Sequence, residues 1–442
     1  MIEIDLLVSG DYVLPMDTEC SVIKDGAVAV RDGKIVAVGC RKDLIDMYSA
    51  KKELGGLYRA VLPGFVNAHT HLPMAYFRGM ADDIPLKLWL EGHIWPTENA
   101  WLDDDFCYDA SLLACLEMLK AGVTVYNNMY FFGDAIARAT KRIGMRGVVG
   151  AGIVDFPTKT ASSSVECLSN AEDLLKTWTG DDLIVPSVAP HSLYTCAPES
   201  FSSARKLAER YGAPLHIHLS ETRWEVEEIR RRYGKTPIEL LDSIGFLSER
   251  VLAAHCVWPL ESEIEILAKC NVAVAHCIES NMKLASGIAP VIDMLKAGVR
   301  VALGTDGAAS NNDMSILSEM STAAKVHKAV SDDPTAMDSR TVLSMATRWG
   351  AETLGLGSVT GSLEDGKSAD LIVIDLTKPH LIPLYNIYSH LAYSACASDV
   401  ESVVINGRLV VKDRVLITYD EDKILEKARI WGDKIKMSTL DS

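Results

Sequence analysis

The stretch AVLPGFVNAHTH, residues 60–71, decides how this chain folds. It is an apolar, β-rich run that ends in two histidines, and Pro63-Gly64 near its start lets the chain enter a strand from a preceding segment. Seven further runs of this kind follow, namely GVTVYNN (122–128), MRGVVGAGIVDF (145–156), LIVPSVAPHS (183–192), APLHIHLSET (213–222), VLAAHCVW (251–258), NVAVAHCIES (271–280) and VRVALGTDG (299–307).

Longer helical stretches lie between these runs, for example DDFCYDASLLACLEMLKAG at 104–122. Strands that alternate with helices in this way are typical of parallel βα repeats. Eight of them predict an α/β fold, a (β/α)8 barrel of the TIM type over residues 61–360. A doubly wound open sheet is the alternative, but the barrel accounts for both the number of strands and the length of the span.

The two ends of the chain have a different pattern, in which short strands are joined by tight turns. Asp32-Gly33 and Asn406-Gly407 each stand between two β-rich runs, as in two-residue hairpins. We therefore expect residues 1–60 and 361–418 to form one small β-sandwich domain, separated in sequence but joined in space.

The last segment, residues 419–442, reads as a helix docked on the rest of the protein. Thr418 and Glu421 have the spacing of a capping box. Ile424 and Trp431 then fall on one apolar helical face, which predicts packing against the barrel.

Composition excludes several classes of partner. The 442 residues include 44 Lys and Arg against 60 Asp and Glu, a net charge of -16, so the chain lacks the basic footprint that binding to nucleic acid or to an anionic membrane requires. No apolar run approaches the roughly 20 residues that span a bilayer, and the N-terminus does not resemble a secretory signal. The ten cysteines are dispersed without a C-x-x-C pair, which indicates reduced thiols in a cytoplasmic protein.

Polar side chains gather at the C-terminal ends of the strand-like runs, the rim on which barrel enzymes build their active sites. They include seven of the eleven histidines, His69, His71, His191, His216, His218, His255 and His276, together with Glu221 and Asp306. His69 and His71 are two residues apart on a strand, so both rings face the barrel interior and form a pair of candidate metal ligands. Nitrogen and carboxylate ligands without a cysteine favour Zn²⁺, with Fe²⁺ or Mn²⁺ as alternatives.

The motifs LPGFVNAHTHLPM, APHSLYT, IHLSET, AAHC, GTDGAASNN and GKSADLIVIDL together resemble the amidohydrolase superfamily, in particular its deaminases of 5'-methylthioadenosine, S-adenosylhomocysteine and 5'-deoxyadenosine. The resemblance implies one divalent metal per subunit, a nucleoside substrate and a homo-oligomer, with a homotetramer suspected. It also implies the metal ligands His69, His71, His218 and Asp306.

The same resemblance implies roles for other residues of the rim. Glu221 matches a proton-shuttling glutamate, and His255 matches a histidine that polarises the attacking water. Glu98 matches a residue that holds the ribose hydroxyls, and His191 matches a substrate-binding histidine. Glu221 and Asp306 would also contact the substrate, and Ser310 would support the site.

The chemistry can also be argued without the family. Removing the exocyclic amine of a purine requires a hydroxide equivalent, and a metal makes one available near neutral pH. Asp306 can accept a proton from the water, Glu221 can protonate the ring nitrogen and the departing ammonia, and His255 can stabilise the developing charge. A solvated acid at the start of a helix is the other interpretation of Glu221. For His216 we favour a buried structural role, and the role of His276 stays open.

The 5' group of the substrate is less well defined by the sequence. Trp89 and Trp95 lie in the long loop after the first strand, where a pocket wall and ordinary packing are equally compatible with the pattern. Relatives that bind the homocysteine carboxylate have arginines near the end of the third strand, whereas this strand end has Ala151, with only Lys159 nearby in the loop. We therefore expect 5'-deoxyadenosine and 5'-methylthioadenosine to be preferred over S-adenosylhomocysteine.

Two alternatives to this function remain open at the level of the sequence. One is an aminohydrolase or chlorohydrolase of the same superfamily that acts on guanine-type bases or triazines. The other is a non-catalytic scaffold protein, against which the complete set of candidate ligands argues.

Overall fold

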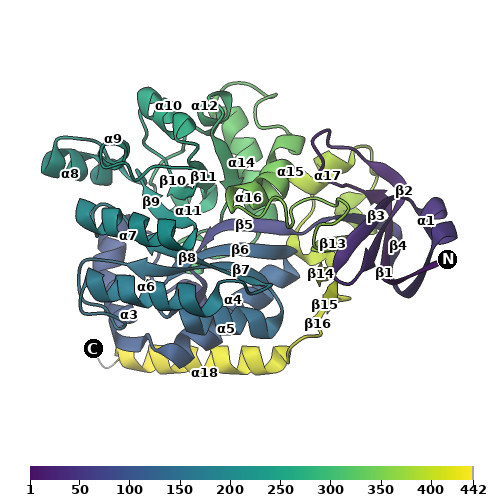
Figure 1. Cartoon of the computed structure of the whole chain (residues 1–442), viewed down its shortest axis with the longest axis horizontal. Helices are drawn as coiled ribbons and strands as arrows, with labels where there is room; N and C mark the ends of the chain where they lie inside the picture. The colour runs from purple at the N-terminus through teal and green to yellow at the C-terminus, as the bar shows by residue number, and fades with distance from the viewer. Residues whose placement is uncertain (441–442) are drawn as a thin grey trace.

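The computed structural model describes residues 1–440, and its centre is a near-closed barrel of parallel strands (Figure 1). Neighbouring strands are paired in chain order from β5 to β12. Their bounds are β5 (Phe65–Thr70), β6 (Val123–Tyr130), β7 (Arg146–Ile153), β8 (Ile184–Pro190), β9 (Leu215–Leu219), β10 (Val251–His255), β11 (Ala273–His276) and β12 (Arg300–Leu303). Each strand coincides with one of the eight predicted runs, although β6 extends two residues beyond its run, so the predicted barrel is confirmed.

Helices connect the strands and cover the outside of the barrel (Figure 1). Between β5 and β6 lie η1 (Leu72–Phe77), α2 (Leu86–Trp89), η2 (Leu90–Ile94), α3 (Trp95–Trp101) and α4 (Asp104–Lys120). The later connections contain α5 (Gly133–Ile143), α6 (Ser164–Trp178), α7 (Pro198–Tyr211), α8 (Arg223–Tyr233), α9 (Pro237–Ser243), α10 (Glu261–Lys269), α11 (Ile278–Lys283) and α12 (Val291–Lys296). After β12 come α13 (Ala308–Asn311), α14 (Ile316–Val330), α15 (Ser339–Ala346) and α16 (Arg348–Thr353).

The interior of the barrel near the N-terminal ends of its strands is filled by small apolar side chains. Val66, Val125, Val148 and Ala302 belong to one buried cluster, which Leu354 of the segment after α16 also joins. Because this end is packed, only the opposite end of the barrel can hold a ligand.

The barrel closes where its first strand meets the segment after its last strand. The Asn67 side chain donates to Thr305 Oγ1 at 2.8 Å and accepts from the Thr305 amide at 3.0 Å. The Asp306 amide donates to the His69 carbonyl at 2.9 Å. These contacts fix two candidate metal ligands, His69 and Asp306, against each other.

Both ends of the chain contribute to a second sheet, as predicted. Its strands are ordered β16-β15-β14-β13-β4-β1-β2-β3, with β1 (Ile2–Val13), β2 (Ile23–Arg31), β3 (Lys34–Cys40), β4 (Tyr48–Pro63), β13 (Leu371–Asp375), β14 (Val400–Ile405), β15 (Arg408–Lys412) and β16 (Val415–Leu416). The antiparallel pairing of β4 with β13 joins the two ends. One core cluster takes Val28 and Val61 from the first end and Leu371 and Val404 from the second. A short helix, α1 (Arg41–Met47), follows β3.

The two predicted hairpin turns are present, and they also touch each other. Asp32 and Gly33 have φ values of 52° and 78°, and Asn406 and Gly407 have values of 50° and 72°, the left-handed conformation that these two-residue turns need. A Cβ added to Gly407 would lie 2.5 Å from the Cα of Gly33, so the contact between the turns depends on glycine.

The terminal helix α18 (Glu421–Leu440) packs along α4, but the predicted capping box is wrong. The Thr418 hydroxyl donates to the Ile143 carbonyl, and Asp420 instead accepts from the Lys423 amide at 3.3 Å. The ring of Trp431 lies 5.2 Å from that of Phe106, centroid to centroid, which confirms the docked face. No helix within residues 1–440 combines the length and apolar character needed to cross a membrane.

A buried ion pair joins the barrel to the second sheet. At the start of β7, Arg146 donates from Nε to Asp370 Oδ2 at 2.9 Å, and its Nη2 donates to Ser368 Oγ at 3.0 Å. The side chains of Arg146 and Asp370 are 5% and 0% exposed. Arg146 therefore holds the two sheets together and points away from the rim.

We expect Arg146→Ala to lower the free energy of unfolding by about 3–5 kcal/mol, because it leaves the Asp370 carboxylate buried without its partner. Denaturant titration followed by circular dichroism measures the change. Lys176→Ala, which removes an exposed ion pair on α6, is the matched control and should cost less than about 1 kcal/mol. Equal losses in the two variants would contradict this role of Arg146.

Candidate active site

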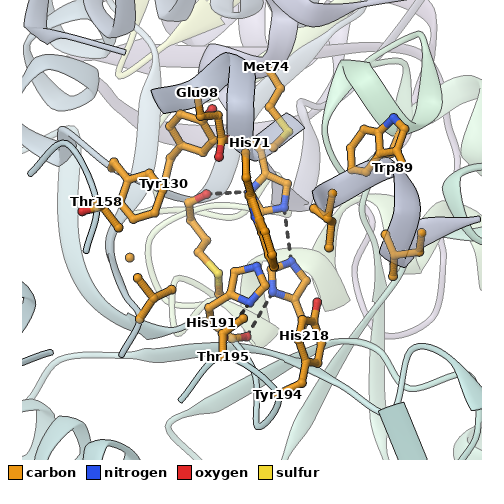
Figure 2. A pocket seen from close by; sticks show the side chains of 18 of the residues that line it. His71, Met74, Trp89, Glu98, Tyr130, Thr158, His191, Tyr194, Thr195 and His218 are labelled. Carbon is orange, nitrogen blue, oxygen red and sulfur yellow. Dashed lines mark hydrogen bonds between the residues drawn. The ribbon is translucent and has the colours of Figure 1, made fainter. Parts of the chain in front are cut away.

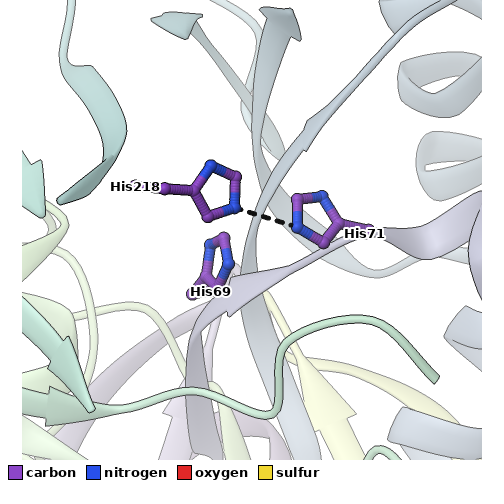
Figure 3. Close-up of side chains that lie close together, drawn as sticks. All are labelled: His69, His71 and His218. Atoms are coloured by element: carbon purple, nitrogen blue, oxygen red, sulfur yellow. Dashed lines mark hydrogen bonds between the residues drawn. The ribbon is translucent and has the colours of Figure 1, made fainter. Parts of the chain in front are cut away.

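Three histidines, His69, His71 and His218, converge at the C-terminal end of the barrel strands (Figure 3), and Asp306 completes a set of four potential metal ligands. His69 and His71 come from β5 and the residue that follows it, His218 comes from β9, and Asp306 follows β12. The Nε2 atoms of His71 and His218 lie 3.2 Å apart. Asp306 Oδ1 lies 3.2 Å from Nε2 of His71 and 3.4 Å from Nε2 of His69.

The other nitrogen of each ring is held from outside the cluster. Nδ1 of His71 lies 2.6 Å from the Met129 carbonyl, and Nδ1 of His218 lies 3.1 Å from the His191 carbonyl. Because a carbonyl only accepts hydrogen bonds, both Nδ1 atoms carry a hydrogen, and the Nε2 atom of a neutral ring at either position presents a lone pair.

The donor set fits a divalent metal ion. His69 Nε2 is buried and has no hydrogen-bond partner, although it points into the cluster. Burial lowers the pKa of His69 to about 3 and that of His218 well below its usual range, so both rings are neutral and able to act as ligands. Lone pairs that face a carboxylate at these distances repel one another unless a cation lies between them.

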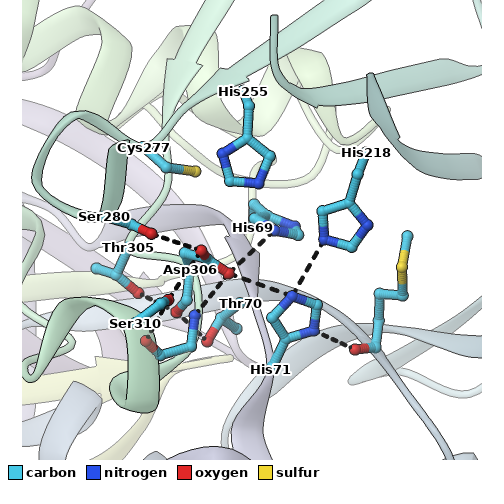
Figure 4. A network of polar contacts seen from close by, with 12 residues as sticks. His69, Thr70, His71, His218, His255, Cys277, Ser280, Thr305, Asp306 and Ser310 are labelled. Carbon is cyan, nitrogen blue, oxygen red and sulfur yellow. Dashed lines mark hydrogen bonds and ion pairs between the residues drawn. The ribbon is translucent and has the colours of Figure 1, made fainter. Parts of the chain in front are cut away.

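Asp306 is positioned by two hydroxyl groups and by its own turn (Figure 4). Its Oδ2 accepts from Ser280 Oγ at 2.7 Å and from Ser310 Oγ at 2.9 Å. Although burial raises the pKa of Asp306, the imidazole rings of His69 and His71 beside it lower that pKa well below the usual range. Ser310 thus contacts a candidate ligand directly.

Glu221 is buried beside the cluster, which argues against a solvated acid at the start of a helix. It is 4% exposed, and its Oε2 lies 3.8 Å from His255 Nε2. Burial raises the pKa of Glu221. Nδ1 of His255 lies 2.9 Å from Asn281 Oδ1, which leaves its Nε2 facing Glu221. This pair could move a proton between the substrate and the site.

Glu225 holds the turn that presents Glu221. Its carboxylate accepts from the Ser220 amide at 3.0 Å and from the Glu221 amide at 2.8 Å. Ser220 has a φ of 51°, a left-handed conformation that needs such support. Sequence reasoning missed Glu225, because an acid in a charged helix looks like an exposed one.

A cavity opens onto the metal ligands, and it brings the predicted substrate residues together (Figure 2). Its wall includes Trp89 and Trp95, whose role the sequence left open. Glu98 on α3 is 7% exposed and accepts from the Tyr130 hydroxyl at 2.5 Å. Burial raises the pKa of Glu98 to about 7. Tyr130 was not predicted, since an aromatic residue that ends a strand is common in cores.

The remaining rim histidines have different surroundings. His191 lines the cavity, and its Nδ1 lies 3.1 Å from Thr195 Oγ1. His216 lies deeper, with Nε2 2.8 Å from His69 Nδ1. His276 faces away from the ligands, because its Nε2 lies 3.0 Å from Nε2 of His327.

One lysine, Lys159, lines the cavity on the side formed by β7, the third strand of the barrel. Gly152 of β7 and Lys159 of the following loop both contribute to the wall. Among the described residues that line this cavity, Lys159 is the only lysine or arginine. This agrees with the absence of an arginine clamp inferred from the sequence.

The fold and this site define a class of barrel proteins with candidate metal ligands, histidine and aspartate side chains, at the C-terminal ends of the strands. Residues 60–410 match the amidohydrolase family, and the chain belongs to that family.

Similar proteins extend the comparison over nearly the whole chain. A 5-methylthioadenosine/S-adenosylhomocysteine deaminase of Thermodesulfovibrio yellowstonii is 48% identical, covering 98% of this chain and 99% of its own. A 5'-deoxyadenosine deaminase of Methanosarcina barkeri is 44% identical, covering 96% and 97%. The crystal structure of an adenosine deaminase from Xanthomonas campestris with bound zinc is 42% identical over 99% of both chains, with a TM-score of 0.97.

We expect His218→Gln to weaken metal binding by about tenfold or more, because the variant loses one ligand of the cluster. Elemental analysis after dialysis, with titration of the metal into stripped protein, measures the effect. His276→Gln is the matched control, since His276 is equally buried but faces His327, and it should retain the metal. Equal metal content in the two variants would rule out this ligand set.

Proposed function

We propose that this protein is a metal-dependent hydrolase that deaminates 5'-substituted adenosines to the inosine analogues and ammonia. The substrates would be 5'-deoxyadenosine, 5'-methylthioadenosine, S-adenosylhomocysteine and adenosine. The observation that carries the proposal is one cavity lined by metal ligands, by the buried acid Glu221 and by a second buried acid, Glu98. The activities for which the relatives are named support the same reaction, and these relatives are between 42% and 48% identical to this chain.

His69, His71, His218 and Asp306 would hold one divalent metal per subunit. Zn²⁺ suits three imidazoles and a carboxylate best, and Fe²⁺ or Mn²⁺ could replace it. When bound, the metal makes water acidic enough to supply a nucleophile near neutral pH.

The protein's own side chains then move the protons. Water adds at C6 of the purine, the C6–N bond breaks, and ammonia leaves. Asp306 accepts one proton from the attacking water, and Glu221, whose pKa is raised by burial, gives its own proton to the ring nitrogen. Glu221 then takes the remaining proton of the added hydroxyl and passes it to the leaving amine, and the proton held by Asp306 returns Glu221 to its acid form. His255, 3.8 Å from Glu221, stabilises the charge that develops beside it.

Glu98 would select a nucleoside over a free base. A carboxylate can accept hydrogen bonds from both ribose hydroxyls, and the hydroxyl of Tyr130 fixes its orientation. His191, on another wall of the cavity, would contact the substrate as well. Triazines and guanine have no ribose. If the protein were an aminohydrolase of these compounds, the buried acid Glu98 would have no ribose hydroxyls to bind and would remain unexplained.

Lys159, together with Trp89 and Trp95, would line the space for the 5' group. A single flexible lysine binds a carboxylate as a point charge and lacks the bidentate geometry of arginine. We therefore keep 5'-deoxyadenosine and 5'-methylthioadenosine ahead of S-adenosylhomocysteine. The homotetramer that the resemblance implies and the cytoplasmic location that the dispersed cysteines indicate stay predictions.

An ammonia-release screen with Zn²⁺- and Fe²⁺-loaded protein tests the reaction. Ranked by kcat/KM, 5'-deoxyadenosine and 5'-methylthioadenosine should lead S-adenosylhomocysteine and adenosine, and guanine should be inert. Glu221→Gln should lower kcat by about 10²–10⁴-fold without loss of metal, because it cannot transfer the proton. No ammonia from any adenosine, or a Glu221→Gln variant as active as wild type, would sink the proposal.

The nucleoside preference can be tested separately. Glu98→Ala should lower kcat/KM for 5'-deoxyadenosine by about 10–100-fold, through the lost bonds to the ribose, and leave the slow turnover of adenine unchanged. Glu91→Ala is the matched control, because Glu91 is an exposed acid on the preceding helical turn. If Glu98→Ala slowed adenine and 5'-deoxyadenosine equally, Glu98 would not recognise the ribose.

A further inference from the structure

A second group of potential metal ligands lies away from the barrel mouth, in the connection between β13 and β14. It consists of His380 on η3 (Pro379–Leu381), Cys396, and Asp399 on η4 (Ala397–Asp399). These residues flank α17 (Ile387–Tyr393), which packs against α14 and α15 (Figure 1). None of them belongs to the cavity or the catalytic residues described above.

The three donor atoms meet at one point. Asp399 Oδ2 lies 2.8 Å from His380 Nε2 and 3.3 Å from Cys396 Sγ, and the sulfur lies 3.9 Å from the same His380 nitrogen. Zinc bonds of about 2.0–2.3 Å in a tetrahedron place ligand atoms about 3.3–3.7 Å apart. Only small side-chain shifts would bring this trio to those distances.

The arrangement differs from that of a cysteine nucleophile with its base. In such a triad the acid contacts one ring nitrogen and the nucleophile the other, so that a proton can pass between them. Here the thiol and the carboxylate both face Nε2 of His380, which is the geometry of shared coordination.

Asp399 provides an independent reason for a cation. Its side chain is 1% exposed, and its Oδ1 is buried without a hydrogen-bond partner. The Cys396 amide donates to Oδ2 at 2.9 Å, as in a capped turn, but Oδ1 receives no hydrogen bond. A buried carboxylate of this kind is stabilised by a positive ion beside it.

We propose that His380, Cys396 and Asp399 bind a second divalent metal ion of the Zn²⁺ type. Thiolate, imidazole and carboxylate ligands favour Zn²⁺ over Mg²⁺ or Ca²⁺. His380 and Cys396 are exposed, so a water molecule can complete the coordination. The ion would close the loop from residue 380 to residue 399 and fix α17 against its neighbouring helices, a structural role that is separate from catalysis.

Cobalt loading tests this site in the full chain. The protein is first stripped of metal and then titrated with Co²⁺. Because the histidine cluster at the barrel mouth contains no sulfur ligand, a thiolate-to-Co²⁺ charge-transfer band would report on binding at Cys396. We expect the wild type to bind two equivalents of Co²⁺, to develop the band and to gain Tm as the second site fills. Cys396→Ser should bind one equivalent, lose the band and the gain in Tm, and retain ammonia release.

Two further variants make the result decisive. Cys40→Ser, which alters another exposed cysteine, should behave as wild type. His380→Ala should keep the strong first equivalent and weaken the second by about tenfold or more. A wild type that binds one equivalent, or a band and a Tm gain that persist in Cys396→Ser, would overturn the proposal.

Discussion

The rest of the site depends on one close contact at the mouth of the barrel, where ring nitrogens and a carboxylate oxygen direct their lone pairs at one another. His71 and His218 direct their Nε2 atoms at each other from 3.2 Å, and Asp306 Oδ1 lies as close to His71. Because main-chain carbonyls hold the Nδ1 hydrogens of both rings, the two Nε2 atoms carry no hydrogen when the rings are neutral. The fold thus holds the ligands from the outside and reserves their centre for a cation.

Barrel closure and site assembly are consequences of the same contact. The segment after β12 reaches β5 through Asn67 and through the amide of Asp306, which donates to the His69 carbonyl. The approach is so close that a Cβ at Gly304 would lie 2.8 Å from the His69 amide nitrogen. A side chain at position 304 would therefore separate two metal ligands as well as two strands.

The sequence predicts those parts of the protein that have a periodic pattern of apolar residues or a characteristic turn dipeptide. Alternation of apolar runs with helices identified the barrel, and two-residue turns such as Asn406-Gly407 identified the sheet built from both ends. Contacts between distant segments were harder to foresee. The Thr418 capping box fails because the helix begins at Glu421 with Asp420 before it, and the Thr418 hydroxyl instead donates to the Ile143 carbonyl. Likewise, Glu225 and Ser280 support Glu221 and Asp306 from positions that have no sequence signature of their own.

The two buried acids of the cavity are carried by different kinds of structure, and in the proposed mechanism this separates reaction from recognition. Glu221 follows directly from β9, and its turn is held by Glu225, so its place relative to the metal ligands is fixed by the barrel. Glu98 lies instead on α3, within the long connection after β5. Connections of this kind can change without disturbing the strands. Under the proposed function, the ligand set carries the reaction, and the segment that carries Glu98 contributes to the choice of substrate.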